Sequence, residues 1–373
     1  MTNNIIYIIF VNTKNPDNME PVFANRLIAA RKMAGLSLQG LANKLGNIVT
    51  RQALNKYEQG IMKPNSELVI KLSEVLNVTV DFFFSKSNIN VQLLDIDFRR
   101  YSSKLNKTEK TAVQGKAKDI LERYLDLENF LNIEEPPSYF SYPSIIKNYA
   151  DAEAAAKKLR VDWDLGYDPI PDVVEMLEDK GYKVVEIEAP ESFFGLKAQT
   201  NGKKVIVLRK DSKDVNIVRK RLTAMHELAH HSLKFPEGIT SKGEEKLCNA
   251  FASAVLYPEE MVRRDLHKDR FNFYQNELQI IKERWGISFT AIFSRALILG
   301  IINDSVYKRL NIGYRGKMLH KNEPGKFLSR ENPVRFERLI FLALAKELIS
   351  INEAAYYSGT SVWTFRKRIH PLV

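Results

Sequence analysis

The sequence has few of the features that mark secreted or membrane proteins. It has a single cysteine, Cys248, in 373 residues, which excludes a disulfide within the chain and fits a reducing cytoplasm. No apolar run reaches the roughly 18 residues of a membrane span. The opening stretch IIYIIFV lacks a basic residue before it and a cleavage site after it, so it does not fit a signal peptide. We expect a cytoplasmic protein without membrane contact, in which residues 1–22 are an extension; a short strand there, or a true start at Met19, both stay open.

Histidine is scarce too, with six in the chain, and we find neither an internal repeat nor a low-complexity tract. The chain is 45% hydrophobic and 27% charged, which is typical of a globular protein with a sizeable core. Its length favours two or three domains. A net charge of +11 favours a polyanionic partner, although many basic proteins bind none.

Residues 23–86 contain five short helical patterns separated by turn signals. Ser37 precedes LQGLANKLG and Thr50 precedes RQALNKYEQG, and both residue types commonly cap helices. Two short helices joined by a tight turn are typical of a helix-turn-helix, whose second helix enters the major groove of DNA. The alternative is a five-helix bundle used for protein contacts.

The second of these helices begins with polar side chains that suit base recognition. Arginine can bond guanine bidentately, and glutamine can bond adenine. Over residues 23–86, nine Lys and Arg stand against four Asp and Glu, a surplus that favours phosphate contacts. The residues that we expect at the DNA are Ser37, Thr50, Arg51, Gln52, Asn55 and Lys56.

The order of these motifs is specific: R-L-x-x-A-R, S-L-x-x-L-A, T-R-x-x-L-x-x-Y-E-x-G, then a proline and L-x-x-L-x-x-x-L. Over about 60 residues it resembles the XRE (Cro/lambda-repressor-like) family of helix-turn-helix proteins. The resemblance implies a five-helix domain that binds double-stranded DNA, usually as a homodimer on a palindrome.

A connection follows at 87–146, and the pattern changes again from about residue 147. The connection holds one long amphipathic helix, TEKTAVQGKAKDILERYLDLENFLN, which either packs the domains together or mediates dimerisation. Beyond it come two helices and three strand patterns, YKVVEIE, FFGLKAQT and KKVIVLR, the last two joined by Asn201-Gly202. We therefore expect a mainly α fold with a small β-sheet (α+β), with a second domain at 147–262 and a helical C-terminal domain at 263–373.

A metal-binding motif, His226-Glu227-Leu228-Ala229-His230, lies in the helix expected after these strands. Histidines four residues apart in a helix project from one face and can share a zinc ion, while the glutamate polarises a water on the metal. The alternative is a pair of surface histidines that binds nothing.

A catalytic zinc site needs a third protein ligand, and the next helical pattern, GEEKLCNAFASAVLYP, offers two. We favour Glu245, because Asn249 lies four residues on and can bond a ligating imidazole from the same face. Glu244 is the rival, since the sequence does not fix the helix phase. We expect Cys248 and His231 to be structural, and we consider Tyr257 as an oxyanion donor.

The combination RKRLTAMHELAHH and E-x-L-C-N-A-F-A-x-x-x-L-Y-P resembles the ImmA/IrrE family of metallopeptidases over roughly residues 150–262. The family's usual glycine is replaced by Ala229, and its common phenylalanine by Leu222. The resemblance implies a minimal zincin-like domain with Zn²⁺ held by His226, His230 and Glu245. It also implies Glu227 as general base in the cleavage of a repressor or partner protein in response to a signal.

Three functions stay open at this point. The first is a DNA-binding regulator with a zinc endopeptidase, in which Glu227 takes a proton from water and returns it to the leaving amine. The second is a regulator whose zincin-like domain is a sensor or scaffold without catalysis. The third is an antitoxin or immunity-type partner. We favour the first, because all the groups that catalysis needs are present.

The last 25 residues have a helix-turn-helix outline of their own, INEAAYYSG followed by TSVWTFRKRI. Three cations cluster at its end, so a second nucleic-acid contact is conceivable. We favour a packing bundle instead, with the aromatic residues in its core. Those residues are Tyr356, Tyr357, Trp363 and Phe365.

Overall fold

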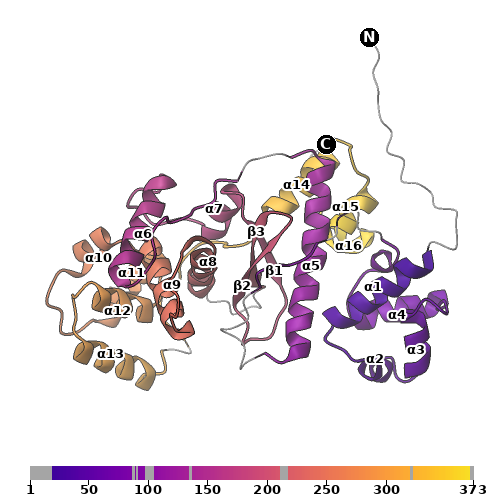
Figure 1. Cartoon of the computed structure of the whole chain (residues 1–373), viewed down its shortest axis with the longest axis horizontal. Coiled ribbons are helices and arrows are strands. Elements are labelled where there is room, and N and C mark those ends of the chain that lie inside the picture. Colours follow the sequence, from indigo (N-terminus) through magenta and orange to yellow (C-terminus); the bar gives the residue numbers. More distant parts are fainter. Residues whose placement is uncertain are drawn as a thin grey trace, which may run out of the picture. The chain divides into compact units, whose positions relative to one another are not determined.

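The computed structural model describes residues 19–85, 89, 91–96, 105–133, 137–210, 217–319 and 322–369 (Figure 1). Most of the extension expected at 1–22, including its apolar stretch, lies outside them. The described chain is mainly helical with one three-stranded sheet, which confirms the expected fold class. None of the described helices is both long and apolar enough to cross a membrane.

The chain divides into two compact units. The first takes residues 1–90, 106–132 and 337–373, and the second takes 91–105 and 133–336. These units group the segments differently from the ranges expected from the sequence. The long helix of the connection joins the first unit, and the range 263–373 is split, because its last helices pack on that long helix and its earlier ones pack on the second unit.

The first unit begins with the expected helix-turn-helix domain. Each of its five elements contributes at least one fully buried apolar side chain to the core. The side chains of Ser37, Thr50 and Asn65 cap three helices by accepting a hydrogen bond from a backbone N–H three residues on, so each helix begins where the sequence predicts. The elements are α1 (Met19–Met33), α2 (Leu38–Lys44), α3 (Arg51–Glu58), α4 (Ser66–Leu76) and a 3-10 turn (Asp81–Phe83).

The rest of this unit is organised on the long helix α5 (Lys107–Phe130). It begins with a capping box, in which the side chains of Asn106 and Glu109 satisfy each other's backbone N–H groups. Helices α1 and α15 pack against α5. The C-terminal helices are α14 (Arg335–Ala345), α15 (Ile351–Ser358) and α16 (Val362–Arg366).

The second unit contains the sheet, in the order β1-β3-β2. Strand β1 pairs parallel with β3, and β2 pairs antiparallel with it. Asn201 and Gly202 join β2 to β3 with φ values of 48° and 73°, a two-residue hairpin turn that needs positive φ at both positions. The elements before and within the sheet are α6 (Tyr149–Asp162), α7 (Val173–Asp179), β1 (Lys183–Ile187), β2 (Gly195–Thr200) and β3 (Lys203–Arg209).

Two antiparallel neighbours, α8 (Ile217–Ser232) and α9 (Ser241–Leu256), pack together beside the sheet, and α6 packs on α9 (Figure 1). The approach of β2 to α8 is close. A Cβ atom at Gly195 would lie 2.7 Å from Cγ2 of Thr223, one turn before the metal motif. Glycine at this position therefore lets the sheet support the motif helix directly.

The second unit is completed by four helices and a returning segment. The helices pack around Trp285 and Phe289, both fully buried. The segment that follows them, 322–334, returns to α7 and α8: buried Glu331 accepts hydrogen bonds from the N–H groups of Val173 and Val174 and pairs with buried Arg221 of α8. The helices are α10 (Glu259–Leu266), α11 (Gln275–Trp285), α12 (Phe289–Ile298) and α13 (Asp304–Gly316).

Candidate functional sites

The metal motif lies on α8, in the middle of the second unit. His226 and Glu227 have exposed fractions of only 1% and 4%, and His230 is half-buried on the same face as His226. Among the described residues, no hydrogen bond engages the Glu227 carboxylate. The motif thus places two imidazoles and an uncommitted carboxylate in a largely water-free environment.

Glu245 of α9 completes a group of three ligand atoms. Nε2 of His226 lies 3.1 Å from Nε2 of His230. The Glu245 carboxylate oxygens lie 3.3 Å from the first nitrogen and 3.2 Å from the second. Ligands about 2.0–2.1 Å from a tetrahedral zinc ion lie roughly 3.3 Å from one another. The three residues therefore fit a zinc ion without rearrangement, and they are the group that the described residues offer to a metal.

The other nitrogen of each imidazole also has a partner. Nδ1 of His226 lies 3.0 Å from the amide oxygen of Asn249, to which it can donate. Nδ1 of His230 lies 3.3 Å from a carboxylate oxygen of Glu244. Such contacts fix the tautomer and leave Nε2 free to bind a metal. Glu244, the rival for the third ligand, therefore lies behind a ligand rather than beside the ion.

Without a metal, His230 and Glu245 form a charged pair. Burial on its own lowers the pKa of His230, but hydrogen bonds with Cys248, Glu244 and Glu245 outweigh it and raise this pKa to about 12. Burial raises the pKa of Glu245, but hydrogen bonds from His226 and His230 lower it far below the usual range. Because a ligating histidine must be neutral, metal binding at this site has to release a proton.

Three further residues considered from the sequence have structural contacts. Nε2 of His231 lies 2.9 Å from the Val205 carbonyl oxygen, and Cys248 is buried with Sγ 3.7 Å from Nδ1 of His230. The suggestion that Tyr257 serves as an oxyanion donor is wrong. Tyr257 leaves the helical conformation at the end of α9, is fully buried, and donates its hydroxyl to Asp265.

Two lysines of the sheet hold the end of the motif helix, and the sequence reading missed them. Lys197 of β2 donates to the His230 carbonyl oxygen at 3.2 Å, and Lys204 of β3 donates to that of His231 at 2.9 Å. Cations at a helix C-terminus complement its partial negative charge and satisfy its free carbonyls. Only Lys197 offers a signal in the sequence, because it alternates with buried residues along β2.

In the first unit, α3 presents the side chains that the sequence assigns to DNA. Arg51, Gln52 and Lys56 are exposed and Asn55 is half-buried, while the opposite face of α3 buries Leu54 and Tyr57 in the core. Ser37 and Thr50 are exposed as well, and their side-chain oxygens cap α2 and α3. Ser37 and Thr50 therefore stand at the starts of the two helices of the motif, and the other four residues lie on α3.

An ion pair not foreseen from the sequence fixes α3 against α1. Arg31 donates two hydrogen bonds to the carboxylate of Glu58, at 2.6 and 2.8 Å, and a third to the Leu36 carbonyl oxygen. A bidentate pair of this kind is geometrically specific. It sets the angle at which the last turn of α3 meets the rest of the domain.

Comparison with known proteins supports the helix-turn-helix domain. The helix-turn-helix family model matches residues 27–83. An HTH-type transcriptional regulator from the SPbeta prophage of Bacillus subtilis, YonR, is 36% identical over 75 residues, which are 20% of this chain and 68% of that protein. The chain belongs to the helix-turn-helix family of transcriptional regulators.

Other relatives match over segments of similar length. An HTH-type transcriptional regulator of Sinorhizobium medicae is 34% identical over 73 residues, 20% of this chain and 51% of that protein. The Bacillus subtilis regulator YqaE is 36% identical over 61 residues, 16% of this chain and 51% of that protein. The chain thus spans about half the length of several relatives that it matches. No solved structure matches it.

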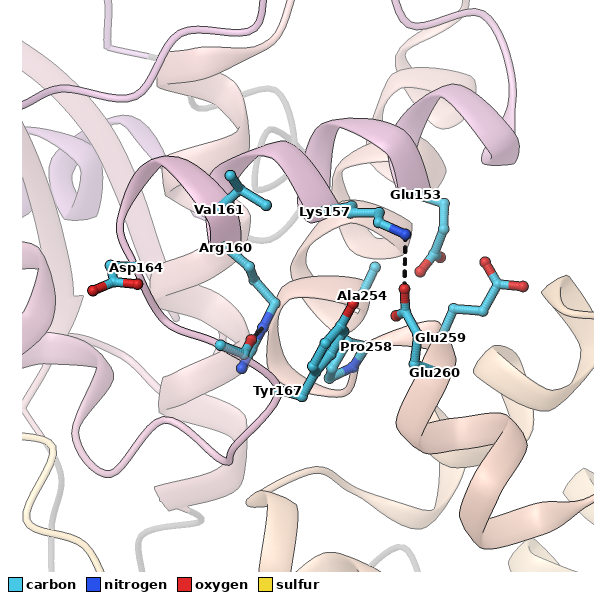
Figure 2. Close-up of a pocket in the computed structure, with 11 residues that line it drawn as sticks. Glu153, Lys157, Arg160, Val161, Asp164, Tyr167, Ala254, Pro258, Glu259 and Glu260 are labelled. Carbon is cyan, nitrogen blue, oxygen red and sulfur yellow. Dashed lines mark hydrogen bonds and ion pairs between the residues drawn. The ribbon is translucent and has the colours of Figure 1, made fainter.

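The second unit of the regulator also has a cavity of about 240 Å³ between α6 and the junction of α9 with α10 (Figure 2). The Lys157–Glu260 ion pair, 2.8 Å long, joins two of the residues that line it (Figure 2). Ala254 in its wall is nine residues from Glu245 on α9, or roughly 13 Å along the helix axis. The cavity is therefore separate from the metal cluster.

Proposed function

We propose that this regulator binds double-stranded DNA through α2 and α3, and that its second unit is a zinc-dependent endopeptidase that cleaves a repressor or another partner protein. The observation that carries the peptidase half is the spacing of His226, His230 and Glu245, in which three ligand atoms lie 3.1–3.3 Å apart. A pair of surface histidines without a function would not need this arrangement.

The proposed DNA binding is supported by the exposed side chains of α3 and by the positive net charge of residues 23–86. Exposed Arg51 and Gln52 carry the donors and acceptors that distinguish guanine and adenine in the major groove, and Lys56 adds a cation for phosphate. A surplus of five cations over residues 23–86, nine against four, adds sequence-independent affinity. Family membership supports the same function, with a homodimer on a palindromic site as its usual form.

In the proposed peptidase, each residue of the metal cluster has one task. When bound, Zn²⁺ supplies Lewis-acid chemistry, making water more acidic and a carbonyl more electrophilic. His226, His230 and Glu245 hold the ion, while Asn249 and Glu244 hold the two imidazoles. Glu227 accepts a proton from water and donates it to the departing amine. Its carboxylate suits this task because no described group engages it.

The test compares the wild type with Glu227→Gln, which keeps every ligand but removes the base. Both are expressed in the native host, and new protein N-termini are identified by mass spectrometry, with Glu237→Gln as an exposed control of the same chemistry. The proposal expects a small set of N-termini from the wild type and the control that Glu227→Gln does not produce.

Identical N-termini from wild type and Glu227→Gln would overturn the peptidase half. If Glu245→Ala then still altered transcription, the alternative would apply, in which the zinc site is a sensor or scaffold without catalysis. The DNA half is tested separately, by selecting bound duplexes from a random library. Recovery of no preferred sequence would contradict recognition of bases by α3.

A further inference from the structure

The C-terminal helices α15 and α16 form a second helix-turn-helix in the first unit. α15 ends at Gly359, whose φ is 66°, and α16 begins after Ser361, whose hydroxyl accepts a hydrogen bond from the N–H of Thr364. The turn between the helices is residues 359–361. A turn of about three residues containing glycine is typical of the motif. The expected outline is thus present, and the two helices pack together.

Trp363 of α16 is not part of the core, contrary to expectation. Tyr357 and Phe365 are buried as expected, and Phe365 stacks on Phe341 of α14. Trp363 is 68% exposed. Leaving so large an apolar ring in water is costly, and Nζ of Lys367 lies only 3.4 Å from its ring centroid. Packing inside the unit therefore does not explain Trp363.

The surface around Trp363 carries positive charge without acidic residues in the same segment. Arg366, Lys367 and Arg368 are all exposed, and residues 361–369 contain no Asp or Glu. Arg368 pairs with Glu337 of α14, whereas Arg366 has no ion pair with a described residue. An exposed indole beside two available cations suits a sugar–phosphate backbone, where cations meet phosphates and the ring covers a sugar.

Helix α5 joins this surface to the helix-turn-helix at the N-terminus. Arg26 of α1 donates to Glu122 of α5 at 3.3 Å. The next residue of α5, Arg123, donates to the Tyr357 carbonyl oxygen, and the Tyr357 hydroxyl donates at 3.0 Å to Asp126, one turn further on. Helices α1 and α15 are thus both fixed to the same stretch of α5, residues 122–126, within one compact unit.

We propose that α16 is a second contact with double-stranded DNA, in which Trp363, Arg366 and Lys367 bind the sugar–phosphate backbone without reading bases. This inference rests on the proposed DNA binding by α2 and α3 and adds a separate surface to it. It goes beyond the expectation of a packing bundle, because it adds a DNA contact to the packing of these helices. Each cation contributes through release of counterions from the DNA.

The test measures binding of the full chain to a fluorescein-labelled duplex of random sequence, over a series of salt concentrations. The variant is Arg366→Ala/Lys367→Ala. Its matched control is Lys308→Ala/Lys317→Ala, which removes the same charge from exposed positions of α13 and the residue after it. We expect the variant to lower the slope of log K against log salt by about 2 and to weaken binding about tenfold at moderate salt, with little change in the control.

An unchanged slope and affinity in the variant, with a wild type that binds DNA, would overturn this inference alone. A wild type that binds no duplex would overturn both the inference and the proposed DNA binding. Far-ultraviolet circular dichroism of the variant excludes misfolding as the cause of any loss.

Tryptophan fluorescence gives a second readout that needs no charge change. Trp163 and Trp285 are buried, so acrylamide quenching of the wild type reports mainly on Trp363. Unlabelled duplex should protect this component from acrylamide, and Trp363→Phe should lack it. If Trp363 stays as accessible in the complex as in the free protein, it does not contact DNA.

Discussion

The side-chain amide oxygen of Asn249 lies 3.0 Å from Nδ1 of His226, on the side of the imidazole opposite Glu245. This contact turns Nε2 of His226 towards the ligand cluster. His226 of α8 is thus held by two residues of α9, with Glu245 at Nε2 and Asn249 at Nδ1. In the proposed zinc site, Asn249 therefore orients His226 before an ion binds.

Replacing Asn249 should weaken metal binding without abolishing it. Asn249→Ala leaves three ligands but frees the ring of His226, so we expect the affinity for Zn²⁺ to fall about 10- to 100-fold with the stoichiometry unchanged. Competition with a chromophoric chelator measures this affinity. Asn311→Ala, on α13, is the control. Equal affinities in the wild type and Asn249→Ala would contradict the assigned role.

The buried Arg221–Glu331 pair should be essential for the stability of the second unit. Glu331→Ala leaves a buried guanidinium uncompensated and two N–H groups at the start of α7 without their acceptor. We expect a loss of about 3–5 kcal/mol in the free energy of unfolding, measured with urea. Glu260→Ala breaks the exposed pair with Lys157 and should leave the midpoint unchanged. Equal midpoints in the two variants would refute this account.

Acid should destabilise the second unit through His231. Burial lowers the pKa of this residue to about 3, whereas in the unfolded chain it is about 6.5. Between these values the unfolded chain binds a proton that the folded chain does not. The free energy of unfolding should therefore fall as the pH drops below about 6.5, by up to about 1.4 kcal/mol per pH unit.

Urea unfolding of metal-free protein at several pH values measures this effect. His231→Gln does not titrate and keeps a donor for the Val205 carbonyl oxygen, so it should lose this part of the pH dependence. Parallel curves for the wild type and the variant would show that another group is responsible.

Two substitutions on α3 should separate base recognition from phosphate binding. Gln52→Ala should relax the preference at one base pair by about 1–3 kcal/mol, and Lys56→Ala should weaken binding to all duplexes alike. Fluorescence anisotropy on selected and scrambled duplexes measures both effects. Lys71→Ala, on α4, serves as a control. A uniform loss on every duplex with Gln52→Ala would mean that Gln52 does not read a base.

The helix starts and the metal cluster could be predicted because their signals are local. Capping residues mark the starts of α2 and α3, and the four-residue spacing of His226 and His230 places both on one face of a helix. The choice between Glu244 and Glu245 needed the structure. Adjacent helical positions differ by about 100° in direction, and only the packing of α9 on α8 determines which one faces Nε2 of both histidines.

Long-range pairs could not be predicted from the sequence. Glu331 is 110 residues from Arg221, and no periodicity indicates that the two meet. Tyr257 was assigned wrongly because the chain leaves the helix at that residue, which turns the hydroxyl towards Asp265. The expectation that Trp363 lies in a core rests on the usual burial of large aromatic rings, but this ring is 68% exposed.

Metal content of the purified protein tests the central claim most directly. Elemental analysis should find about one zinc per chain in the wild type, almost none in Glu245→Ala, and about one in Glu244→Ala with zinc in excess. This pattern would establish Glu245 as the third ligand and Glu244 as a group behind His230. A well-folded wild type that holds no zinc, even after reconstitution, would contradict the peptidase account and leave a DNA-binding regulator.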